Sequence, residues 1–189
     1  TGKMFACEHF DIDPDILTLA KGIASGMPLG AMIAREGIMD WIPGSHASTF
    51  GGNPISCRAA LATIEILDNG VVDNAAEMGV YFKGQLKELQ HEHSLIGDVR
   101  GLGLMLGIEL VKDRERKTKA VEERDLIVEM AFRSGLLLLG CGENSVRFIP
   151  YRTLMIFNKV RVLINMEFTT NLHGFYAILT AFFYTIKTQ

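Results

Sequence analysis

Cysteine is scarce in this sequence, which contains only Cys7, Cys57 and Cys141 and no CxxC pair. An odd number of widely spaced cysteines predicts neither a disulfide framework nor a zinc site. His91 and His93 stand two residues apart in a polar segment, and residues at that spacing do not share a helix face. We therefore expect reduced thiols, no bound metal and a cytoplasmic location.

A basic surplus and long apolar runs are lacking as well. Lysine and arginine total 19 against 22 aspartate and glutamate residues, giving a net charge of -3. Nothing in this balance favours binding to a nucleic-acid backbone. The apolar stretch at residues 174–186 is too short to cross a bilayer. We expect neither a nucleic acid nor a membrane as partner.

The chain has the size and composition of a globular protein, with 189 residues of which 48% are hydrophobic. Its first residues, TGKMFACEHF, include no initiator methionine and no basic-then-apolar secretion signal. This opening predicts that the sequence is a piece of a longer protein.

The first half of the chain alternates short apolar runs with loops. Residues 16–20 and 30–34 are apolar and are connected by GIASGMPLG, which predicts two buried strands joined by a tight loop. Residues 43–54, PGSHASTFGGNP, are too rich in Gly, Pro and Ser for regular structure. They lead into ISCRAALATIEIL, a segment of helical length that ends at DNG.

The second half also mixes helices and strands. Spacings of three and four residues predict a helix whose apolar face is Ala75, Met78, Phe82, Leu86 and Leu89. Residues 102–111 predict a strand, and residues 112–125 predict a solvated loop because they are highly charged. A further helix has the apolar face Leu126, Ile127, Met130 and Ala131. Residues 135–140 and 145–150 predict two more strands, and we place a domain boundary at residues 68–73.

Lys21 stands where the first predicted strand meets the glycine-rich loop. A lysine at the end of a buried strand is desolvated unless its ammonium reaches water or a partner, and burial favours the neutral amine. A neutral amine is a nucleophile that can form a Schiff base with an aldehyde cofactor, and the glycines allow close approach. The alternative is a surface lysine whose stem covers apolar residues. Spacing alone leaves both interpretations open.

Five sequence blocks identify a resemblance to a known family: TGKMFACEH, PDILTLAKGIASGMPLGA, HASTFGGNP, VRGLGLMLGIEL and VRFIP. From residue 1 to about residue 150 they resemble the class III pyridoxal-phosphate-dependent aminotransferases, most closely the 4-aminobutyrate and acetylornithine aminotransferase group. The resemblance implies an α/β protein of PLP-dependent transferase fold type I, with a mostly parallel sheet in its large domain. We accordingly expect part of that large domain at residues 1–70, a smaller C-terminal α/β domain at residues 71–150, and a divergent tail at residues 151–189.

The resemblance also implies roles for four residues and a homodimer with active sites at its interface. Lys21 matches the lysine that holds pyridoxal 5'-phosphate as a Schiff base and shuttles a proton during amino transfer. Thr49 matches a threonine that binds the cofactor phosphate in the neighbouring subunit, and Ser48 lies where the family places a residue near the substrate. Arg147 matches the arginine that binds a substrate carboxylate. From the residues alone, turn chemistry for Ser48 and Thr49 and a surface position for Arg147 remain open.

Three functional hypotheses follow. The first is an aminotransferase that moves an amino group from an amino acid or a 4-aminobutyrate-like ω-amino acid to a 2-oxo acid, with an acetylornithine or ornithine enzyme as a variant. The second is a PLP-dependent racemase of the same fold. The third is an inactive fragment, because the family's aspartate at the pyridine nitrogen, its ring-stacking aromatic residue and its phosphate loop would all precede Thr1. We expect the 189-residue chain alone to show no appreciable turnover.

Overall fold

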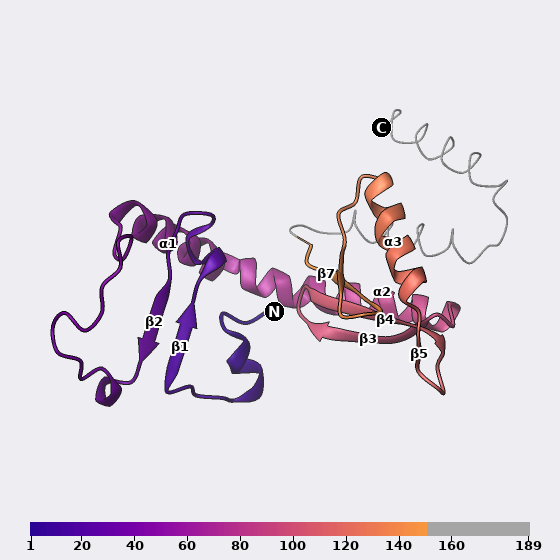
Figure 1. The fold of residues 1–189 in the computed structure, drawn as a ribbon, viewed down its shortest axis with the longest axis horizontal. Coiled ribbons are helices and arrows are strands. Elements are labelled where there is room, and N and C mark those ends of the chain that lie inside the picture. The colour runs from indigo at the N-terminus through magenta and orange to yellow at the C-terminus, as the bar shows by residue number, and fades with distance from the viewer. Residues whose placement is uncertain (151–189) are drawn as a thin grey trace. The chain divides into compact units, whose positions relative to one another are not determined.

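In the computed structural model, residues 1–150 are described, and the chain divides into two compact units, Thr1–Glu77 and Met78–Gln189 (Figure 1). The predicted tail at residues 151–189 lies outside the described residues. Helix α2 (Val72–Glu92) begins in the first unit and continues into the second. The assignment of these units to the two domains of the family stays a prediction.

The first unit contains a two-stranded sheet of β1 (Ile16–Leu19) and β2 (Ala31–Ala34). Both strands lie where the sequence predicts them, but the expected burial is wrong, because Ile16 is 49% and Ile33 52% exposed. The strands pair antiparallel, with Ile16 opposite Ala34 and Leu19 opposite Ala31. Among the described residues no third strand joins this pair, so each strand has one edge without a strand partner there.

Four helical segments accompany this pair: η1 (Ala6–Phe10), η2 (Lys21–Ala24), η3 (Glu36–Ile38) and α1 (Pro54–Ile66). α1 begins directly after the glycine-rich loop, as predicted. The predicted stop at DNG is visible as an irregular turn, η4 (Leu67–Val71), in which Gly70 has a φ of 92°. A positive φ is accessible to glycine at little steric cost, so the helical path is broken there before α2 starts.

The second unit contains a five-stranded sheet in which every pairing is antiparallel. Its strands are β3 (Ile96–Leu102), β4 (Met105–Asp113), β5 (Thr118–Lys119), β6 (Leu139–Cys141) and β7 (Ser145–Phe148), in the order β3-β4-β7-β6 with β5 beside β4. The expectation of a mostly parallel sheet is therefore wrong for the described strands. β3–β4 and β6–β7 are each joined by short connections, whereas a parallel pair requires a longer crossover.

The β3–β4 hairpin corrects two further expectations. The predicted single strand at residues 102–111 is divided, because Leu102 ends β3 and the chain reverses at Gly103, whose φ is 51°. The charged segment at residues 112–125 is not simply a loop. It includes the end of β4, strand β5 and the start of α3 (Val121–Arg133).

One face of the sheet is covered by apolar residues of α2 and α3. The predicted α2 face is largely confirmed, since Phe82, Leu86 and Leu89 are buried, and the ring of Phe82 lies edge-on to that of Phe148 at 5.5 Å. On α3, Ile127 and Ala131 are buried as expected, but Leu126 is exposed. The strands add the buried residues Ile96, Val99, Leu106, Ile108, Leu110, Val146 and Phe148.

Candidate functional site

Lys21 is the first residue of η2. Ala20, whose backbone is extended, separates it from the end of β1. Its φ of 53° places the backbone in the left-handed region, which side chains other than glycine, asparagine and aspartate rarely adopt. The residue is exposed, and within residues 1–150 its ammonium has no hydrogen-bond or ion-pair partner. Of the two interpretations that the spacing leaves open, the structure shows an exposed rather than a desolvated lysine, because β1 itself is only half buried.

The turn that carries Lys21 is held against α1. Ala24 of η2 and Ser56 and Ala60 of α1 are buried, and small side chains let the two helices approach closely. The hydroxyl of Ser25 lies 2.9 Å from that of Thr63, which in turn donates to the carbonyl of Ala59 at 2.8 Å. No sequence pattern predicts this Ser25–Thr63 hydrogen bond, since the two residues lie far apart in the chain.

The turn is open at its glycines. A Cβ built at Gly22 or Gly26 would meet no atom within 4 Å apart from those of its chain neighbours. The amine of Lys21 is thus accessible and carries no competing partner among the described residues. These features fit a lysine that binds an aldehyde cofactor, and pyridoxal phosphate is the group that the resemblance implies.

Ser48 and Thr49 lie in the loop before α1, and both are exposed. The backbone turns tightly there, since the amide of Gly51 donates to the carbonyl of Ser48 at 3.2 Å. Neither hydroxyl has a hydrogen-bond partner within the described part of the chain. Lys21 and this loop belong to the same unit and adjoin the same helix, Lys21 through η2 and the loop through the start of α1.

Asn53 supports this loop and was missed by the sequence analysis, although Asn followed by Pro is a recognisable helix start. Its side-chain oxygen accepts hydrogen bonds from the amides of Ile55 at 3.0 Å and Ser56 at 3.2 Å. Pro54 occupies the first turn, where the missing N–H is no loss. The cap therefore fixes where the Ser48–Thr49 loop ends and α1 begins.

Replacing Asn53 with alanine is expected to lower the free energy of unfolding by about 0.5–2 kcal/mol, because two first-turn amides lose their acceptor. Asn53→Asp is the matched control, since it keeps the acceptor and adds a charge favoured at a helix N-terminus. Urea unfolding followed by circular dichroism measures both. Equal stabilities of the alanine and aspartate variants would contradict the capping role.

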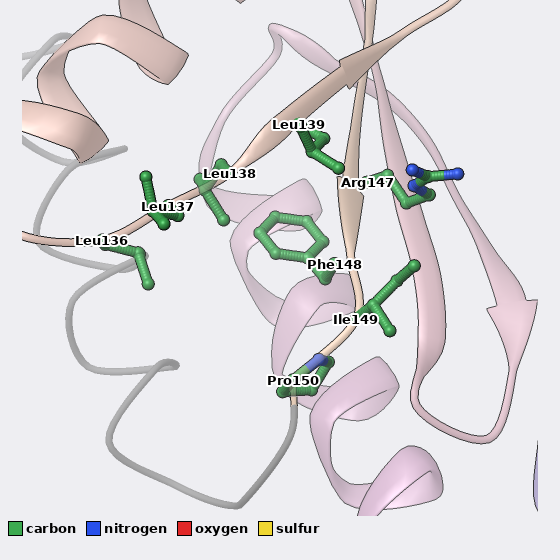
Figure 2. Close-up of a pocket in the computed structure, with 8 residues that line it drawn as sticks. All are labelled: Leu136, Leu137, Leu138, Leu139, Arg147, Phe148, Ile149 and Pro150. Carbon is green, nitrogen blue, oxygen red and sulfur yellow. The ribbon is translucent and has the colours of Figure 1, made fainter. Parts of the chain in front are cut away.

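Arg147 lies in the second unit, on β7, and points away from the buried face to which its neighbours Val146 and Phe148 belong. Its Nε is buried and has no hydrogen-bond partner among the described residues. A cavity of about 90 Å³ beside it is lined by residues 136–139 and 147–150 (Figure 2). Arg147 is therefore a cation with an unused donor at the wall of a mainly apolar cavity.

Arg100 is another arginine on the same sheet, but its charge is already balanced. Its guanidinium lies 2.8 Å from Asp98 and 2.6 Å from Glu109. The hydrogen bond from Arg100 holds the pKa of the Glu109 carboxyl below its ordinary value, against a smaller opposing effect of burial. Arg147 differs from Arg100 in having no carboxylate partner among residues 1–150, and its buried Nε has no acceptor there.

The comparisons with known proteins identify the family. The model of the family described as aminotransferase class-III matches residues 1–159. The chain belongs to the class III aminotransferases. It is 44% identical to the leucine/methionine racemase of Thermococcus litoralis over 82% of this chain and 35% of that protein. It is 40% identical to the acetylornithine aminotransferase of Caldanaerobacter subterraneus over 79% of this chain and 36% of that protein.

Solved structures of aminotransferases share the fold. An aminotransferase from Bacillus anthracis superposes with a TM-score of 0.81 and 33% identity, covering 88% of this chain and 42% of that one. An amine transaminase from an uncultivated Pseudomonas species, solved in its PLP-bound form, gives a TM-score of 0.75 and 32% identity, over 87% of this chain and 39% of that one.

The class III chain described here is short beside its relatives, since it spans about a third of the length of the curated proteins it matches. The α/β prediction and the family are confirmed, and the family uses pyridoxal phosphate. None of the helices within residues 1–150 is both long and apolar enough to span a membrane.

Proposed function

We propose that this chain is the C-terminal part of a pyridoxal-phosphate-dependent enzyme that transfers an amino group from an amino acid or ω-amino acid to a 2-oxo acid. The observation that carries the proposal is the backbone conformation and accessibility of Lys21. In a segment that matches the family, it combines a left-handed backbone, an accessible amine and no partner within the described residues. Unfavourable backbone geometry of this kind clusters at functional sites.

Lys21 would hold the cofactor covalently through its amine. Pyridoxal phosphate, when bound, supplies an aldehyde that condenses with amines and a ring that withdraws electrons from the substrate's Cα–H bond. Once a substrate amine replaces it, the Lys21 amine would be free to take the proton from Cα and deliver it to the cofactor carbon that the lysine had held, which amino transfer requires. The Ser25–Thr63 hydrogen bond, by tethering η2 to α1, would hold that amine in place.

Ser48 and Thr49 would act in the same reaction from the loop before α1. Both present hydroxyl groups that are free of partners within residues 1–150, and a Thr hydroxyl with its backbone amide can donate to a phosphate. We assign Thr49 to the cofactor phosphate bound by a second copy of the protein, in a homodimer, and Ser48 to the neighbourhood of the substrate. In the second unit, Arg147 would bind the substrate carboxylate, a role supported by its unpaired Nε.

Racemisation of an amino acid is the second candidate. The match to the Thermococcus litoralis leucine/methionine racemase favours it, and the isoleucine 2-epimerase of Lentilactobacillus buchneri is 39% identical over 79% of this chain and 34% of that protein. Lys21 would serve this reaction as well, because it too begins with proton removal at Cα. Accumulation of a 2-oxo acid would distinguish amino transfer from racemisation, which yields the opposite enantiomer.

Reduction with borohydride tests the assignment of Lys21. The 189-residue chain is incubated with pyridoxal phosphate, reduced, digested and mapped by mass spectrometry. We expect the pyridoxyl label on Lys21 and not on Lys117, an internal control that is also exposed and has the same φ of 53°. Labelling spread evenly over exposed lysines, or absent from Lys21, would overturn the proposal.

A further inference from the structure

The outer face of the second unit's sheet is ordered in rows across the strands. Residues directly opposite one another on neighbouring strands share a face. The register pairs Leu139 with Arg147, Arg147 with Gly107, and Gly107 with Arg100. These four residues therefore form one row, which we call the arginine row, on the face opposite to the buried core.

The surroundings of Arg147 in this row are apolar on two sides. Leu139 is the neighbour of Arg147 on β6 and is 58% exposed. Ile149 lies two residues after Arg147 in the chain and is 60% exposed. Figure 2 shows Leu139 and Ile149 near Arg147, with the ring of Phe148 on the other side of the strand from Arg147. On the β4 side Gly107 has no side chain, and a Cβ there would make only an ordinary contact at 3.5 Å. Space is thus left beside the guanidinium.

The charges of the row favour one kind of ligand. Arg100 is neutralised by Asp98 and Glu109, whereas Arg147 keeps a buried, unpaired Nε–H. A carboxylate beside the partly exposed side chain of Arg147 would add a charge-assisted hydrogen bond to a cation that has no carboxylate partner among the described residues. A second charged group placed against Leu139 or Ile149 would lose hydration without gaining a partner.

Simple sheet geometry places both apolar residues within reach of such a ligand. Neighbouring strands lie about 4.8 Å apart, and residues two apart along a strand are separated by roughly 6.6 Å. A carbon chain of four to six atoms that begins at a carboxylate on Arg147 therefore extends over Leu139 or Ile149.

We propose that the arginine row selects carboxylates with an apolar carbon chain, with Arg147 binding the carboxylate and Leu139 and Ile149 contacting the chain. The interpretation of the arginine row as a substrate site rests on the proposed function. On that basis, the substrates are amino acids with apolar side chains rather than dicarboxylates or short ω-amino acids. Leu139 and Ile149 are then specificity-determining residues.

The test uses the 189-residue chain without cofactor and measures binding of three carboxylates by titration calorimetry or chemical-shift perturbation. The ligands are 4-methylpentanoate, which has an apolar chain, glutarate, which has a second carboxylate, and 4-aminobutyrate. We expect 4-methylpentanoate to bind about fivefold or more tightly than either of the others, since each buried methylene contributes roughly 0.8 kcal/mol, or about fourfold.

Variants separate the contributions. Arg147→Lys should weaken binding of all three ligands because the planar donor pair is lost. Leu139→Asn and Ile149→Thr should remove most of the preference, whereas Leu126→Asn, an exposed leucine on α3, should leave it unchanged. Circular dichroism verifies that each variant is folded.

Three outcomes would overturn the proposal: no measurable binding, equal binding of the three ligands, or a preference that survives both Leu139→Asn and Ile149→Thr. Because pyridoxal phosphate is absent from these titrations, their failure is distinguishable from failure of the Lys21 assignment. A Lys21 label with no carboxylate preference would leave the proposed function standing and remove the specificity role.

Discussion

Lys21→Ala is expected to lower turnover at least about 10³-fold in a chimera that joins this chain to the N-terminal part of the Thermococcus litoralis racemase. The substitution removes both the amine that would hold the cofactor and the base that would move the Cα proton. The two readouts are formation of a 2-oxo acid and inversion of the amino-acid enantiomer. Lys117→Ala is the matched control, because Lys117 is also exposed and has the same φ of 53°.

A chimera that keeps more than a tenth of its activity after Lys21→Ala would contradict the assignment. An unsubstituted chimera that folds and binds pyridoxal phosphate but is inactive would contradict the proposal that this chain retains a working site.

The backbone at Lys21 predicts a gain in stability from a substitution that removes function. The left-handed conformation costs most residues about 1–2 kcal/mol, whereas glycine adopts it freely at the expense of chain entropy. Lys21→Gly is therefore expected to raise the free energy of unfolding of the 189-residue chain by about 0.5–1 kcal/mol relative to Lys21→Ala. Urea unfolding of the two variants measures this difference, and a glycine variant no more stable than the alanine variant would argue against strain at this position.

Gly79→Ala is expected to produce the largest loss of stability, about 3 kcal/mol. Gly79 lies on α2 against the turn of the β3–β4 hairpin, and a Cβ at this position would come within 2.2 Å of the carbonyl carbon of Gly103. Both sides of this contact are backbone, so the clash cannot be relieved by rotating a side chain. α2 and the hairpin must move apart, and the packing of Phe82 on Phe148 is expected to weaken with them.

Gly84→Ala on the same helix is the matched control. A Cβ at Gly84 meets nothing within 4 Å, so alanine there is expected to stabilise the helix by about 1 kcal/mol through its higher helix propensity. Denaturant unfolding of both variants should therefore give changes of opposite sign. Two stabilising substitutions would mean that the close approach of α2 to Gly103 does not exist in solution.

Local sequence signals predicted many of the elements. The spacing of Phe82, Leu86 and Leu89 predicted the buried face of α2, because a helical period places these residues on one side. The glycine-rich segment before Pro54 predicted the start of α1. In contrast, the hairpin turn at Gly103 was read as the interior of a strand, since an apolar run continues through it and glycine alone does not reveal its φ.

For the candidate site, the sequence indicated which residues to consider and which family they belong to. It did not indicate the conformation or the contacts of those residues. Lys21, Ser48, Thr49 and Arg147 were selected because five ordered blocks match a family, and the family match is confirmed. Their roles stay predictions. The tether from Ser25 to Thr63 could not be anticipated, because it joins residues 38 positions apart through a contact that no local pattern encodes.

The sequence by itself determined the positions of many helices and strands, the family, and which side chains carry the relevant chemistry, because these depend on residue type and short-range order. Only the tertiary structure decided that the strands pair antiparallel, that Lys21 is exposed on a left-handed turn, and that Arg147 shares a row with Leu139 and Gly107. Strand direction, register and burial arise from contacts between segments distant in the chain. The energies of these contacts depend on the segment with which each strand pairs or packs. The order of residues within one strand does not specify that partner.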